Sequence, residues 1–131
     1  MRVRRAVIDA IVEQARRERP LECCGLLIGT GDEVIQSRAA RNARASAVAY
    51  LVDPRDHFDA IRDARAKGLS VVGAYHSHPR SPAQPSETDI REANDPDFIH
   101  VIVSLANEEP QVAAFRMNDG QAIGLPLAIV D

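Results

Sequence analysis

Short apolar runs bounded by turn residues recur along the whole chain and constrain it to a fold built on a β-sheet. Runs rich in Val, Ile and Leu that end at Gly, Pro, Asn or Asp are typical of strands, because β-branched side chains pack well on a pleated surface. Gly31 and Asp32 form a turn signal between two of these runs. The predicted strands cover residues 21–29, 33–43, 47–52, 69–78, 98–105, 111–117 and 123–130.

Three helical segments interrupt the strands. Apolar residues at helical spacing predict a helix over about residues 6–18, which ends before Pro20. Residues 53–68 have the clearest helix signals, with Asp53 as N-cap, Pro54 at the first helical position and Gly68 as the stop. A short third helix over 86–94 begins at Ser86. This order predicts a single α/β (α+β) domain over residues 1–131, with a mixed central β-sheet flanked by helices.

Composition excludes several classes of function. The formal net charge of −3 provides no basic surface of the kind that nucleic-acid binding needs. No apolar run approaches the roughly 18–20 residues that cross a bilayer, so no membrane association is expected. Asp9 and Glu13 interrupt the N-terminal segment, which therefore lacks a signal-peptide core, and the expected location is the cytoplasm. The adjacent Cys23 and Cys24 are expected to be small buried hydrophobic residues rather than a disulfide.

Two histidines end the strand predicted at 69–78. Residues two apart in a strand project from the same face, so His76 and His78 lie side by side, roughly 6–7 Å apart at the backbone. That separation allows two imidazoles to converge on one zinc ion. The alternative is a pair of ordinary histidines on a strand, and His-x-His alone does not decide between them.

The next element adds a third candidate ligand. Ser86 and Asp89 lie one helical turn apart, after a proline-rich spacer. They form a capping pattern, in which Ser86 begins the helix, but Asp89 can also supply a carboxylate oxygen to a metal bound by His76 and His78. Two nitrogens, one oxygen and a water are the ligand set of an open, catalytic zinc site.

Hydrolysis at such a site also needs a base that does not bind the metal. Glu22 is the candidate, because it lies at the start of an otherwise apolar predicted strand. The alternative is an exposed glutamate that follows Pro20 and Leu21. Gly25 and Gly29 in the same strand allow either close backbone packing near the site or a bulge.

Taken together, Glu22, His76-Ser77-His78, seven further residues and Ser86-Glu87-Thr88-Asp89 resemble the motif of the JAMM (MPN+) metalloprotease family. The flanking sequences ECCGLLIG and VVGAYHSHP also resemble strands of that family. The chain is compact, with little room for extra insertions, and in this it resembles the family's short, stand-alone prokaryotic members. The resemblance implies the JAMM/MPN (cytidine-deaminase-like) fold. It also implies a Zn²⁺ cofactor held by His76, His78 and Asp89.

The resemblance further implies roles for the two remaining residues. Glu22 would act as general acid and base on a zinc-activated water, and Ser86 would donate a hydrogen bond to the oxyanion. The expected reaction is hydrolysis of a peptide or isopeptide bond. The expected substrate is the C-terminal Gly-Gly tail of a ubiquitin-like, sulfur-carrier protein, bound in a groove beside the zinc or added as a strand to a sheet edge.

The alternative function is a non-enzymatic MPN-type module that binds a ubiquitin-like partner and uses its metal only for structure. A structural site does not need the extra carboxylate of Glu22, which favours the enzyme. His57 and His100 have no ligand-like partners in the sequence, and both are expected to be structural.

Overall fold

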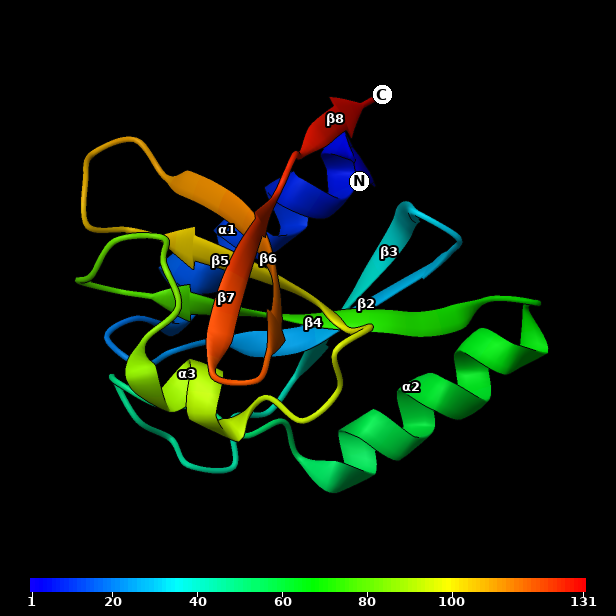
Figure 1. Ribbon diagram of the computed structural model, residues 1–131, viewed down its shortest axis with the longest axis horizontal. Coiled ribbons are helices and arrows are strands. Elements are labelled where there is room, and N and C mark those ends of the chain that lie inside the picture. Colours follow the sequence, from blue (N-terminus) through cyan, green and yellow to red (C-terminus); the bar gives the residue numbers. More distant parts are fainter.

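The computed structural model describes residues 1–131, and its strands form one eight-stranded sheet (Figure 1). The strand order is β7-β6-β5-β4-β2-β3-β1-β8. Most neighbours are antiparallel, but β4–β5, β1–β3 and β1–β8 are parallel, so the predicted mixed sheet is confirmed. The strands are β1 (Arg2–Arg4), β2 (Cys24–Thr30), β3 (Glu33–Ala40), β4 (Ser70–His78), β5 (Ile99–Ser104), β6 (Gln111–Asn118), β7 (Gln121–Leu125) and β8 (Ala128–Val130).

The three helices follow the sequence signals closely. They are α1 (Arg5–Glu18), α2 (Pro54–Ala66) and α3 (Glu87–Glu92). The Asp53 carboxylate accepts hydrogen bonds from the first backbone N–H groups of α2, and Gly68 adopts a positive φ of 72° just beyond its end. Ser86 caps α3. Each predicted helix is therefore confirmed, with boundaries that differ by one or two residues.

The strand predicted at residues 47–52 is wrong. This segment is a loop that joins the sheet only through an isolated bridge between Asn42 and Val52. The Asn42 side chain explains the difference, because its amide donates to the carbonyls of Glu22 and Ala49 while its oxygen accepts from the N–H groups of Arg44 and Leu51. Backbone groups that would otherwise pair with a strand are thus satisfied by one side chain.

The ends of the chain also differ from the prediction. Strand β1 is too short to leave a pattern in the sequence, and the run 123–130 forms parts of two strands, β7 and β8, separated by Pro126 and Leu127. These two strands lie at opposite edges of the sheet. A two-residue connection spans at most about 11 Å, whereas eight strands laid flat would be about 33 Å wide. The sheet must therefore curl until its edges approach each other.

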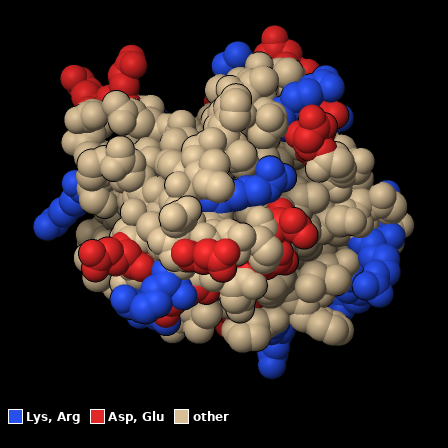
Figure 2. All heavy atoms as spheres, in the orientation of Figure 1, with Lys and Arg blue, Asp and Glu red and all other residues tan.

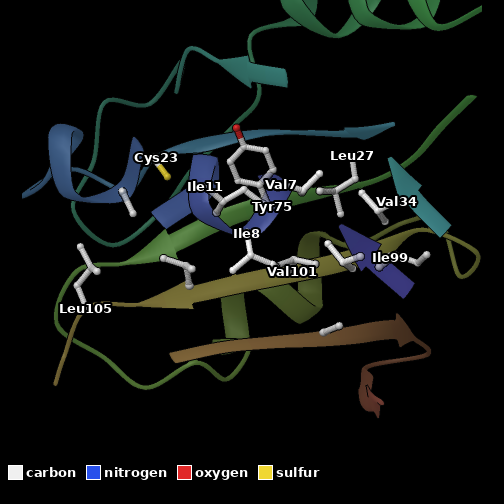
Figure 3. Close-up of a cluster of buried hydrophobic side chains, with 14 residues drawn as sticks. Val7, Ile8, Ile11, Cys23, Leu27, Val34, Tyr75, Ile99, Val101 and Leu105 are labelled. Carbon is white, nitrogen blue, oxygen red and sulfur yellow. The ribbon is translucent and has the colours of Figure 1, made fainter. Parts of the chain in front are cut away.

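Helices cover the two faces of this curled sheet unequally. In Figure 1, α1 lies on one side of β4, and α2 and α3 lie on the other. The α1 face holds a cluster of 14 buried hydrophobic residues, including Ile11, Leu27, Tyr75 and Val101 (Figure 3). The α2 face holds a cluster of only three, Leu26, Ala60 and Ala74. Because side chains alternate along a strand, the residues of β4 that flank Tyr75 project toward the α2 face.

The surface carries both signs of charge. Figure 2 shows acidic and basic side chains interspersed over the face seen in Figure 1, with uncharged residues between them. None of the helices has the length and the apolar character needed to span a lipid bilayer.

Candidate metal centre

His76 and His78 lie at the end of β4, in the interior of the sheet. Strand β4 pairs with β2 on one side and β5 on the other, so its backbone is held from both sides. The two side chains project from the same face, as predicted, with their ring centroids 5.0 Å apart. Their exposed fractions are 0% and 3%, so they are buried histidines rather than ordinary surface residues.

Asp89 reaches the two histidines from α3. It forms a capping box with Ser86: the Ser86 Oγ accepts from the Asp89 N–H at 3.0 Å, and the Ser86 N–H donates to Asp89 Oδ2 at 2.9 Å. The predicted cap is therefore confirmed, and the same carboxylate faces His76 and His78. The capping box holds the Asp89 side chain in place independently of a ligand, because its Oδ2 accepts from the Ser86 N–H within the same turn.

Three side-chain atoms converge at this point. His76 Nε2 lies 3.2 Å from His78 Nε2, and Asp89 Oδ2 lies 3.1 Å from the first nitrogen and 3.2 Å from the second. Ligands at 2.0–2.1 Å from a tetrahedral zinc are separated by about 3.3 Å. The three atoms therefore have the spacing of one face of a zinc coordination shell.

The protonation of these side chains is compatible with metal binding. His78 Nδ1 lies 2.9 Å from the Pro82 carbonyl oxygen, so it carries the proton, and the neutral ring then presents a lone pair at Nε2. Burial by itself would raise the pKa of Asp89, but the neighbouring imidazoles of His76 and His78 hold it well below its usual range, so Asp89 is a carboxylate. Two imidazole nitrogens and a carboxylate oxygen thus face one point, and a metal ion fits this set of donors.

The two histidines are affected differently by their surroundings. Burial lowers the pKa of His76. Burial also acts to lower the pKa of His78, but the contacts with Asp89 and the Pro82 carbonyl outweigh it and raise that pKa. Burial thus favours the neutral form of His76, which is the form of histidine that binds a metal.

Glu22 lies beside this group, just before β2, with 3% of its surface exposed. One atom each of Glu22, His76 and His78 lie within 4.8 Å of one another, but only Asp89 comes within 3.2 Å of both imidazoles. Glu22 Oε1 is buried without a hydrogen-bond partner in the protein. Burial raises the pKa of Glu22 to about 7, with a smaller opposing effect from His78. Glu22 thus has the environment of a proton-transfer group rather than that of an exposed glutamate. We call His76, His78, Asp89 and Glu22 the candidate metal centre.

Tyr50 completes the surroundings of His76 and was not anticipated. Its ring stacks on the His76 imidazole, with centroids 4.3 Å apart and planes 18° apart. The Nδ1 atom of His76 is buried and has no hydrogen-bond partner, unlike that of His78. The orientation of His76 thus depends on packing against Tyr50. The local sequence gave no signal for this contact, because Tyr50 lies in the loop that was predicted as a strand.

The residues next to Glu22 have structural surroundings. Cys23 and Cys24 are both buried and free, as expected, and burial raises the pKa values of their thiols to about 11 and about 12. Gly25 lies against the ring of Tyr75, where a Cβ atom would approach within 2.3 Å, so it serves the α1 face rather than the candidate metal centre. Gly29 lies at a bulge in β2, against the backbone of Glu33.

Known proteins resemble this chain over almost its full length. Residues 4–118 match the family described as prokaryotic homologs of the JAB domain. The chain is 30% identical to the CysO-cysteine peptidase of Mycobacterium tuberculosis over 132 residues, which cover 98% of this chain and 90% of that protein. It is 38% identical to the probable TtuB-protein conjugate cleaving protease of Thermus thermophilus over 124 residues, 94% of this chain and 80% of that protein.

Solved structures share the fold. Protein DSY2949 from Desulfitobacterium hafniense superimposes with a TM-score of 0.91 at 31% identity, covering 100% of this chain and 94% of that one. AF2198, a JAB1/MPN domain protein from Archaeoglobus fulgidus, superimposes with a TM-score of 0.64 at 21% identity, covering 100% of both chains. The predicted JAMM/MPN fold is therefore confirmed.

Proposed function

The chain belongs to the family of prokaryotic homologues of the JAB domain, and we propose that it is a zinc-dependent peptidase or isopeptidase of ubiquitin-like, sulfur-carrier proteins. Its relatives are peptidases, and the chain is a hydrolase of the JAMM type. The zinc ion, the role of each site residue and the identity of the substrate are the parts of this assignment that we propose.

One observation carries the proposal: two imidazole nitrogens and a carboxylate oxygen lie 3.1–3.2 Å apart beside a second carboxylate that lacks a partner. A purely structural metal site has no use for the additional buried carboxylate, whose burial is costly. A hydrolytic site needs such a group to move a proton. The arrangement thus favours the enzyme over the binding module.

Each residue then has one task. His76, His78 and Asp89 would hold the metal, with the proton on His78 Nδ1 and the capping box of Asp89 keeping both side chains in place. Bound zinc would act as a Lewis acid that lowers the pKa of a water and polarises the scissile carbonyl. Glu22 Oε1 would accept a proton from the attacking water and pass it to the leaving amine.

Ser86 remains free to donate a hydrogen bond to the substrate. Its Oγ accepts from the Asp89 N–H in the capping box, which leaves the hydroxyl proton without a local acceptor. We assign that proton to the developing oxyanion, where one donor is worth about 10²–10³ in rate. The cap and the catalytic role are thus compatible in one side chain.

The proposed substrate is the Gly-Gly tail of a ubiquitin-like carrier, followed by an amino acid or a conjugated protein. Two relatives support it, since their names describe cleavage of CysO-cysteine and of TtuB-protein conjugates. Strands β7 and β8 end the sheet and carry no residue of the candidate metal centre. Strand β3 pairs with β1 only at Glu33 and Val34, so the rest of β3 has an open edge. Its Ala40 is in register with Cys24, which in turn is in register with His76. We place the tail in a groove beside the metal, with addition to the open edge of β3 as the alternative.

Metal analysis tests the ligand set. The purified protein should contain one zinc ion per chain, and His76→Ala, His78→Ala and Asp89→Ala should each lose it. Glu22→Gln should retain it. Loss of zinc from His76→Ala but not from Asp89→Ala would show that the third ligand is wrongly assigned, and Glu22 would then be the next candidate.

Cleavage tests the activity. The zinc-loaded protein should cut ubiquitin-like carriers that bear a C-terminal extension after Gly-Gly, with products identified by mass spectrometry. Ser86→Ala should retain zinc and lose most of the rate. Stable binding of a carrier without cleavage, in a protein that has its zinc, would instead support the binding module.

A further inference from the structure

A cavity of about 530 Å³ opens beside the candidate metal centre on the α2 face. Its floor is a row of three residues that face each other across neighbouring strands: Leu26 of β2, Ala74 of β4 and His100 of β5. Tyr50 and Phe98 are part of its walls. We call this space the side cavity.

The side cavity is continuous with the candidate metal centre. Ala74 lies two residues before His76 on β4, a distance of about 6–7 Å along the strand. Asp89 and Tyr50 line the side cavity and also contact His76. A substrate residue one to three positions from the scissile bond is therefore close enough to place its side chain in this space, because an extended chain advances about 3.3 Å per residue.

His100 is the unusual residue of the floor. Its exposed fraction is 7%, and both ring nitrogens are buried without a hydrogen-bond partner in the protein. A buried polar group without a partner is costly, and such groups in native proteins normally have a purpose. Phe98 contacts the ring edge-on, with centroids 6.2 Å apart, but supplies no hydrogen bond. The interpretation of His100 as merely structural leaves its two polar atoms unexplained.

The other side chains that line the side cavity determine which substrate side chain it can accept. Leu26, Ala74 and Phe98 are apolar, which suits an aliphatic stem. The carboxylates of Asp89, Glu92 and Asp95 line the side cavity, and its one arginine, Arg44, is already bound by both oxygens of Glu92 at 2.9 and 2.6 Å. An acidic side chain would meet like charges there, with no lysine and no free arginine to pair with. The other polar lining residues are His57 and Asn94.

We propose that the side cavity is a specificity subsite that takes one uncharged substrate side chain with an apolar stem and a hydrogen-bonding tip, and that His100 recognises the tip. A neutral imidazole offers one donor and one acceptor, which matches the amide of Gln or Asn and the hydroxyl of Thr. The inference rests on the proposed function, since it assumes that a substrate is bound at the candidate metal centre.

Two positions of the substrate can supply this side chain. The two residues before the scissile bond are glycines in the proposed substrate and have no side chain to offer. The occupant is then either the residue directly after the scissile bond or the carrier residue that precedes the two glycines. Both positions present the same chemistry to His100, and substrates varied at one position at a time distinguish them.

The test uses the zinc-loaded protein and two sets of quenched fluorescent peptides with a central Gly-Gly. One set varies the residue after the scissile bond among Gln, Thr, Leu and Glu, and the other varies the residue before the glycines in the same way. In one of the sets kcat/KM should be highest for Gln or Thr and lowest for Glu. His100→Leu should reduce the Gln-to-Leu ratio about tenfold, the effect of one lost hydrogen bond, while Leu peptides are cut as before.

A hydrogen-bonding replacement is the matched control. His100→Gln should retain the preference for Gln or Thr, whereas a role in packing alone would be served as well by Leu as by Gln. Zinc content and thermal midpoint of both variants check that the candidate metal centre and the fold are intact. A Gln-to-Leu ratio that is the same in wild type and in His100→Leu would overturn the proposal.

A binding experiment separates this inference from the proposed function. In Glu22→Gln, the ring signals of His100 in NMR spectra should shift when Gln or Thr peptides are added and stay in place with Glu peptides. Shifts without cleavage by the wild type would contradict the peptidase and keep the subsite. Cleavage without any shift or preference would contradict the subsite and keep the peptidase.

Discussion

The two faces of the curled sheet are built from the same strands but have opposite characters. Toward α1, β2, β4 and β5 contribute Leu27, Tyr75 and Val101 to one continuous apolar cluster. Toward α2, the same strands contribute His76, His78 and His100, and the apolar cluster shrinks to three residues. Alternation along a strand thus places packing on one side and buried polar groups on the other.

This division has an energetic meaning. On the α1 face, a buried polar contact is satisfied, because the Tyr75 hydroxyl donates to Gln14, whose amide donates to the Cys24 carbonyl. On the α2 face, Glu22, His76 and His100 each keep a buried atom without a partner in the protein. Buried polar atoms left unpaired cost roughly 1–3 kcal/mol each. Apolar packing on the α1 face therefore stabilises the fold and offsets the cost of the unpaired polar atoms on the α2 face.

The largest expected effect is on catalysis from the α2 face. Glu22→Gln should reduce kcat/KM by about 10²–10⁴, because proton transfer by a positioned side chain contributes that much. Zinc content and circular dichroism should be unchanged. Glu13→Gln, an exposed glutamate on α1, is the matched control and should retain full activity. Wild-type activity in Glu22→Gln would remove Glu22 from the mechanism.

A pair of adjacent leucines tests the stability of the two faces. Leu27→Ala should reduce the free energy of unfolding by about 2–5 kcal/mol, since it leaves a hole in the α1 core. Leu26→Ala should cost about 2 kcal/mol, at the low end of that range, because Leu26 borders the side cavity and belongs to a cluster of only three buried residues. Urea unfolding of both variants measures the difference. Equal losses would show that the faces do not differ in packing.

Glu22, the proposed proton-transfer group, should also reduce the stability of the folded protein. The pKa of Glu22 is about 7 in the folded protein and about 4.5 when unfolded, so the unfolded chain releases its proton first as pH rises. The ionisation of Glu22 therefore lowers the free energy of unfolding as pH rises from about 4.5 to 7, and this free energy stays lower above that range. In chelator-treated protein at pH 8, Glu22→Gln should be more stable than wild type by roughly 1–3 kcal/mol. Below pH 4.5, where both side chains are neutral, the advantage should disappear.

The smallest effect concerns the support of His76. Tyr50→Leu should weaken zinc binding by about two- to tenfold, because a stacked pair contributes about 0.5–1.5 kcal/mol. Tyr50→Phe keeps the ring and should bind zinc like the wild type. Competition with a fluorescent chelator gives both affinities. Equal weakening in the two variants would assign the role to the hydroxyl group instead.

Local patterns in the sequence predicted most of the helices and strands. Asp53, Pro54 and Gly68 mark the ends of α2 because capping and positive φ depend on a few neighbouring residues. The grouping of His76, His78, Ser86 and Asp89 was equally predictable, since the strand period and the capping box act within a few residues. The structure places all four where the spacing suggested, with Glu22 beside them.

Contacts made at long range were not predictable in this way. Tyr50 meets His76 only because Asn42 ties the loop that carries Tyr50, a side-chain role that leaves no periodic pattern. His100 joins the side cavity through its register with Ala74 across β4 and β5, which depends on the whole sheet. Strands β1 and β8 have three residues each, too few for a recognisable sequence pattern, and they form strands because they pair with each other.

The pairing of β1 with β8 also sets an order for assembly during synthesis. Residues 22–89, which carry the whole candidate metal centre, leave the ribosome well before the strand at residues 128–130 that pairs with β1. Until residues 128–130 have been synthesised, β1 has one unpaired edge, although all residues of the candidate metal centre are already part of the growing chain. A nascent chain should therefore capture zinc before it becomes resistant to proteases, because the last pairing joins segments about as far apart as the chain allows.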